Sequence, residues 1–101
     1  MMDVRAVKKD GKADVKLIGN LDGTSSDMAA EKILSVLEAG IDLTIDMEQC
    51  PYVSSAGLRV LLSVGKRIKL NNGKMRIVNL IEEVKEIMEI TGFSSIFNEF
   101  T

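Results

Sequence analysis

The chain has 101 residues, 46% of them hydrophobic and 28% charged, which is the length and composition of one folded domain with a single core. Thirteen basic and fifteen acidic residues leave a net charge of −2, so the sequence lacks the basic surplus of a nucleic-acid binder. The lack of histidine, together with a single cysteine, excludes histidine phosphocarriers, an internal disulfide and the usual transition-metal clusters.

Charged residues interrupt every short apolar run, so the sequence predicts neither a secretory signal nor a membrane span. We therefore expect a cytosolic protein that does not bind a membrane. Cys50 fits a reducing compartment and is expected to be a small buried hydrophobic residue.

Two short strands are predicted at the start of the chain, over residues 3–9 and 13–19. In the second, Val15 and Leu17 alternate with polar neighbours, and Asp10-Gly11-Lys12 between the two segments has turn chemistry. These features predict a hairpin.

A polar loop over residues 19–26 comes next and leads into a helix. Thr24 and Asp27 have the spacing of a capping box at its start. Apolar residues then follow at helical intervals until Gly40, which predicts a helix over about 26–39.

The second half of the chain alternates between strands and helices. Strict apolar-polar alternation predicts a strand over 41–47, and apolar residues on one helical face predict a helix over 55–71. A strand over 74–79 and a helix over 80–91 follow by the same patterns. The last segment, 94–101, fits either an edge strand or a short helix.

This order of elements predicts an α/β fold in one domain over residues 1–101. Strands that alternate with helices imply parallel crossovers, and the initial hairpin adds an antiparallel strand. The sheet should therefore be mixed, with four to five strands. Because every second residue of each strand is polar, helices should pack mainly on one face of the sheet and leave the other face exposed to solvent.

Two hydroxyl side chains, Ser54 and Ser55, lie where the helix over 55–71 begins. A helix N-terminus carries unpaired N–H groups and about half a positive charge, so it accommodates a phosphate well. Phosphorylation there would add a charge of roughly −1.5 to −2 without disturbing the core. Taken alone, however, a serine in this position is most often a simple helix cap.

The segment over residues 45–62 closely resembles the signature of the STAS family, the domain shared by sulfate transporters and anti-sigma factor antagonists. Asn20-Leu21-Asp22 after Gly19 looks like the Gly-x-Leu-Asp loop of that family. Residues 72–79 look like its following turn and strand, so the resemblance covers nearly the whole chain. It implies a single STAS-type domain.

In that family, the serine two positions before the motif glycine is the one that is phosphorylated. Counting back from Gly57 assigns this role to Ser55. Ser54 then takes the place of the usual Asp, and Ala56 takes the place of the second hydroxyl residue.

The resemblance implies a bacterial anti-sigma factor antagonist, a binding protein rather than an enzyme. Such a protein binds a serine-kinase anti-sigma factor and releases the sigma factor, phosphorylation ends the binding, and a serine phosphatase resets the switch. ATP should bind the partner, since the sequence lacks a Gly-x-x-x-x-Gly-Lys-[Ser/Thr] loop, and no cofactor is expected. The implied partner surface comprises Asp22, Gly23, Thr24, Ser54, Ser55, Ala56, Gly57, Leu58 and Arg59.

Three other functions are compatible with the sequence. The domain could regulate a different partner-switching pathway or serve as an accessory subunit of a transporter. A small hydrolase with Ser55 as nucleophile would need Lys, Asp or Glu as its base, since histidine is absent. Asp42 and Asp46 could be read as paired catalytic carboxylates, but the alternation predicts that both lie on the solvent-exposed face of a strand.

Overall fold

Alternating apolar and polar residues build the strands of a mixed sheet at the centre of the molecule. A computed structural model describes residues 2–90, 92, 97 and 99–100 of the chain. β1 (Asp3–Lys9) pairs antiparallel with β2 (Lys12–Ile18), and β2 pairs in parallel with β3 (Asp42–Asp46). β4 (Lys74–Val78) and β5 (Glu99–Phe100) continue the sheet in parallel, so the strand order follows the chain. The predicted mixed α/β sheet is therefore confirmed.

The hairpin between β1 and β2 turns at Asp10 and Gly11. Both residues have positive φ angles, 52° and 78°, which is the conformation of the tight hairpin turn whose twist matches that of the flanking strands. The turn aligns Lys9 with Lys12 and fixes the register of the whole pair. The predicted hairpin is confirmed.

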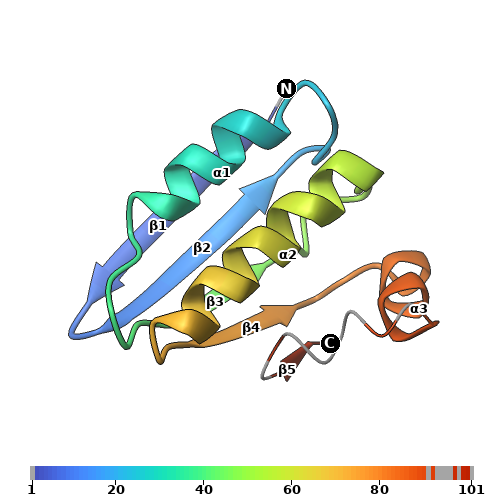
Figure 1. Cartoon of the computed structure of the whole chain (residues 1–101). Helices are drawn as coiled ribbons and strands as arrows, with labels where there is room; N and C mark the ends of the chain where they lie inside the picture. Colours follow the sequence, from blue (N-terminus) through green and yellow to red (C-terminus); the bar gives the residue numbers. More distant parts are fainter. Residues whose placement is uncertain (1, 91, 93–96, 98, 101) are drawn as a thin grey trace.

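Helices α1 (Ser26–Leu34) and α2 (Ser55–Leu70) lie side by side on one face of the sheet (Figure 1). α3 (Glu82–Ile90) lies beyond the end of β4 (Figure 1). The other face of the sheet carries half-buried or exposed polar residues, such as Thr44 and Lys74, as the alternation predicts. None of the helices in the described part of the chain is both long and apolar enough to cross a bilayer.

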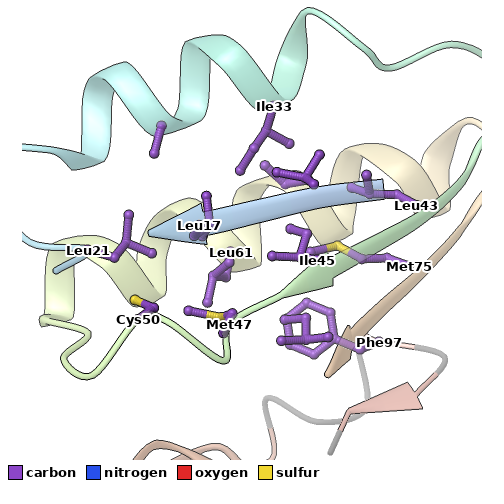
Figure 2. Close-up of a cluster of buried hydrophobic side chains, with 14 of the residues drawn as sticks. Leu17, Leu21, Ile33, Leu43, Ile45, Met47, Cys50, Leu61, Met75 and Phe97 are labelled. Atoms are coloured by element: carbon purple, nitrogen blue, oxygen red, sulfur yellow. The ribbon is translucent and has the colours of Figure 1, made fainter. Parts of the chain in front are cut away.

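The core fills the space between the sheet and the two helices. Leu17 from β2, Ile45 from β3 and Leu61 from α2 point into one cluster, and each is fully buried (Figure 2). Cys50 joins this cluster as a buried free thiol, which confirms the prediction for it (Figure 2).

α1 ends earlier than the periodicity predicts, at Leu34 instead of residue 39. The Ser35 hydroxyl donates to the Lys32 carbonyl at 2.6 Å and so satisfies one of the free carbonyls at the helix end. The next backbone bonds, such as Leu37 N–H to the Leu34 carbonyl at 3.2 Å, span only three residues. This tighter winding packs Val36 and Leu37 against the core, so tertiary packing overrides the helical period.

The other predicted elements differ from the structure only at their ends, within two residues. For the segment 94–101, the structure describes Glu99–Phe100 as a strand that pairs with β4. The rest of that segment, apart from Phe97, lies outside the described residues.

Candidate functional site

Two loops meet at the carboxyl ends of β2 and β3. The Leu21 N–H donates to the Tyr52 carbonyl and the Ser54 N–H donates to the Leu21 carbonyl, each at 2.9 Å. Leu21 and Val53 thereby form a short parallel bridge. The loop that holds Asp22 is thus fastened to the segment that leads into α2, and the two predicted parts of the site lie together.

Asp22 organises its own loop. One carboxylate oxygen accepts bonds from the Thr24 N–H at 2.9 Å, the Thr24 hydroxyl at 2.8 Å and the Ser25 N–H at 3.3 Å. These bonds hold the pKa of Asp22 below its ordinary value. The bond from the Thr24 hydroxyl has the largest effect, and the bond from the Thr24 N–H comes next. Asp22 is therefore held as a carboxylate in a fixed position.

The capping box predicted for Thr24 and Asp27 is wrong. Ser25 is the N-cap of α1, and its side chain makes no capping bond. The Thr24 hydroxyl instead donates to Asp22, which lies outside the helix. The carboxylate of Asp22 competes successfully for this hydroxyl because it is an ionised acceptor only two residues away.

The start of α2 is formed by the two serines. Ser54 is the N-cap, with an extended backbone, and its hydroxyl oxygen accepts the Gly57 N–H at 3.3 Å. Ser55 is the first helical residue, and its side chain is exposed. No hydrogen bond engages the Ser55 hydroxyl in the described part of the chain, so Ser54 alone serves as the cap and Ser55 is left accessible.

Gly57 brings the loop and the helix into close contact. A Cβ atom at this position would lie 2.5 Å from the Leu21 carbonyl oxygen and 2.8 Å from the Leu21 Cγ atom. That carbonyl is the one that accepts the Ser54 N–H. Gly57 is buried, and its missing side chain permits this close approach of two backbones.

The predicted partner surface is only partly on the surface. Gly23, Thr24, Ser55 and Arg59 are exposed, while Leu58 is half-buried and packs against the core. The half-buried members are Asp22, Ser54 and Ala56. The assignment of all of them to partner binding stays a prediction, although Gly57 is buried and has no side chain to offer.

Two residues of this site were missed by the sequence reasoning. The Tyr52 side chain is 53% exposed beside the bridge between the two loops and adds an aromatic group to the surface. The Ser25 hydroxyl is buried, donates to the Asn20 carbonyl at 2.7 Å and accepts the Asp22 N–H at 3.0 Å, so it fastens the loop from within. An aromatic residue directly after Pro51 was the available signal for Tyr52, whereas nothing local distinguishes Ser25 from its neighbour Ser26.

Asp42 and Asp46 lie on the open face of the sheet and have structural partners. Asp42 forms an ion pair with Arg76 across to β4. Asp46 accepts a bond from the Asn79 side chain at 3.0 Å, which is the largest cause that lowers its pKa. These contacts explain the two carboxylates without acid-base chemistry.

The chemistry that this site offers is that of an accessible hydroxyl. A serine nucleophile in a hydrolase is activated by a base within hydrogen-bonding reach, and no such bond joins Ser55 to an acid or amine in the described residues. Phosphorylation by another protein needs only access to the hydroxyl, because the kinase supplies the catalytic groups.

Known proteins resemble this chain in sequence and in structure. The STAS domain family matches residues 3–101. A Bordetella bronchiseptica protein with the provisional name anti-sigma factor antagonist BtrV is 37% identical, over 85% of this chain and 78% of its own length. The anti-sigma-B factor antagonist of Bacillus subtilis is 30% identical over 96% of this chain and 87% of its own.

The likeness extends to solved structures. The phosphorylated form of the Bacillus cell fate determinant SpoIIAA superposes with a TM-score of 0.73 at 12% identity, over all of this chain and 92% of its own. That identity supports the fold alone. The match of the family over residues 3–101, together with the two relatives, shows that this chain belongs to the STAS domain family.

Proposed function

We propose that this chain is an anti-sigma factor antagonist that binds a serine-kinase anti-sigma factor, releases the bound sigma factor and is switched off by phosphorylation of Ser55. The observation that carries the proposal is the exposed, unengaged Ser55 hydroxyl at the first position of α2. The names of the two relatives support the antagonist role, and the phosphorylated form of SpoIIAA is an example of a protein with this fold that carries a phosphate.

The unmodified protein would dock through the exposed residues around Ser55. Gly23 and Thr24 belong to the loop fastened beside the start of α2, and Arg59 lies one turn along the helix. Tyr52 adds an exposed aromatic ring to the same region. Aromatic and arginine side chains are common anchors in protein interfaces.

Phosphorylation transfers the γ-phosphoryl group of ATP, held by the kinase, to the Ser55 oxygen. A new bond forms between this oxygen and phosphorus, the bond to the leaving ADP breaks, and the hydroxyl proton passes to a base of the kinase. The new group adds roughly −1.5 to −2 charges on the docking surface. Because Ser55 is exposed, the core beneath it need not change. A serine phosphatase would hydrolyse the phosphate and restore the binding state.

The proposal is tested by incubating the purified chain with its cognate serine-kinase anti-sigma factor and ATP, and mapping the phosphate by mass spectrometry. We expect a single phosphate on Ser55 and no transfer to Ser55→Ala. Ser54→Ala is the matched control and should still be labelled, because it removes the capping hydroxyl but keeps the Ser55 hydroxyl that receives the phosphate.

Binding provides the second measurement. Ser55→Asp should lose affinity for the kinase while its unfolding midpoint stays close to that of the parent, because the side chain is exposed. Labelling of Ser54 alone, or undiminished binding by Ser55→Asp, would contradict the proposed switch.

A further inference from the structure

Arg59 lies on the same face of α2 as Ser55. The two residues are four positions apart in one continuous helix, Ser55–Leu70, and both are exposed. Residues with this spacing on a helix have Cβ atoms about 5–6 Å apart, within reach of an arginine side chain. A phosphate on Ser55 would therefore form within the range of the Arg59 guanidinium.

Arg59 is not engaged elsewhere in the described part of the chain. The ion pairs there join Arg5 to Asp3, Lys8 to Glu38 and Arg76 to Asp42. Asp27 of α1 lines the same groove of about 490 Å³ between the helices as Arg59, but no ion pair connects them. α2 itself contains no acidic residue, so nothing on the helix competes with a phosphate for this cation.

We propose that the phosphate on Ser55 is bound in cis by the guanidinium of Arg59. The order of the pair is the favourable one, with the anion four residues before the cation on the helix. The planar guanidinium can give two parallel N–H bonds to phosphate oxygens, a geometry that a lysine ammonium does not reproduce. This inference rests on the proposed function, because it names how the phosphorylated state of that same site is built.

The pair would change the docking surface in two ways at once. In the unmodified protein the surface presents a neutral hydroxyl and a free cation. In the phosphorylated protein it presents an excess negative charge, and Arg59 is withdrawn from any acidic group of the partner. The switch therefore removes an attractive contact as well as adding a repulsive one.

The test needs no kinase. Phosphoserine is placed at position 55 during synthesis of the full chain, and the second ionisation of the phosphate is followed by ³¹P NMR as a function of pH. Removal of a cation that stabilises the dianion raises the phosphate pKa. We expect the midpoint to rise by about half a pH unit in Arg59→Gln, the size expected for an exposed pair.

Arg67→Gln is the matched control. Arg67 lines the same groove and lies on the same helix, but twelve residues from Ser55, or about 18 Å along the axis. Its removal should leave the midpoint unchanged. Asp22 and Asp27, the acidic groups of the neighbouring loop and helix, are present in every variant, so their effect cancels in the comparison.

Arg59→Lys should restore part of the shift, because it keeps the charge without the guanidinium fork. Equal midpoints in the parent and in Arg59→Gln, or equal shifts in Arg59→Gln and Arg67→Gln, would overturn the proposed pair. Since the phosphate is installed synthetically, this result is separate from the kinase experiment. A measured pair with no kinase labelling of Ser55 would contradict the proposed function alone, and labelling without a pair would contradict this inference alone.

Discussion

Substitution of Gly57 by alanine tests whether a close backbone contact holds the start of α2 in place. The added Cβ atom would lie 2.5 Å from the Leu21 carbonyl oxygen, a distance at which something must move. The carbonyl belongs to the loop and accepts the Ser54 N–H at 2.9 Å. The substitution therefore pushes the Asp22 loop and the start of α2 apart at the bond that joins them.

The expected change in the free energy of unfolding combines two destabilising effects and one stabilising effect. Overpacking costs about 1–3 kcal/mol, and a weakened hydrogen bond between Ser54 and Leu21 adds about 0.5–1.5 kcal/mol. Replacing glycine by alanine within a helix returns up to about 1 kcal/mol. We expect Gly57→Ala to lower the free energy of unfolding by about 2 kcal/mol.

Urea denaturation followed by circular dichroism measures this change. Gly23→Ala is the control, since Gly23 lies in the loop nearby and an added Cβ would have no atom within 4 Å. It should change the free energy of unfolding by less than about 0.5 kcal/mol. If Gly57→Ala were as stable as the parent or more stable, helix propensity would outweigh the contact, and the argument that Gly57 positions the site would fail.

Two smaller effects should also be measurable. Ser54→Ala removes the acceptor of the Gly57 N–H and should lower the free energy of unfolding by about 0.5–1 kcal/mol, whereas Ser55→Ala, which loses no hydrogen bond in the described residues, should change it little. Equal losses in thermal or urea denaturation would show that the two serines do not divide the roles in this way. Thr24→Val removes the hydroxyl bond to Asp22 and should raise the pKa of that carboxyl, as followed by carbon-detected NMR titration. Because the native pKa lies below the ordinary value of 3.8, the stabilisation from Asp22 is complete above that value and is lost as the pH falls through the native pKa. The stability difference between the parent and Thr24→Val should therefore be present near neutral pH and shrink in acid, and an unchanged Asp22 pKa would contradict the assigned bond.

Most of the secondary structure could be predicted from local pattern. β3 and β4 alternate strictly, so burial of one face follows from the period of the strand itself. The start of α2 could be predicted as well, because a helix needs acceptors for its first N–H groups and the sequence offers two serines there. The exposure of Ser55 follows from the same local rule, whereas its phosphorylation rests on family resemblance.

The sequence by itself determined which segments form strands and helices, since hydrophobic period and capping chemistry act over a few residues. Only the tertiary structure decided how they meet: that α1 ends at Leu34 to pack Leu37 inward, and that Thr24 bonds to Asp22 rather than capping the helix. It also decided that Gly57 is buried against Leu21, a contact between residues 36 positions apart. Such contacts depend on the packing of the sheet and its loops, which no local pattern encodes.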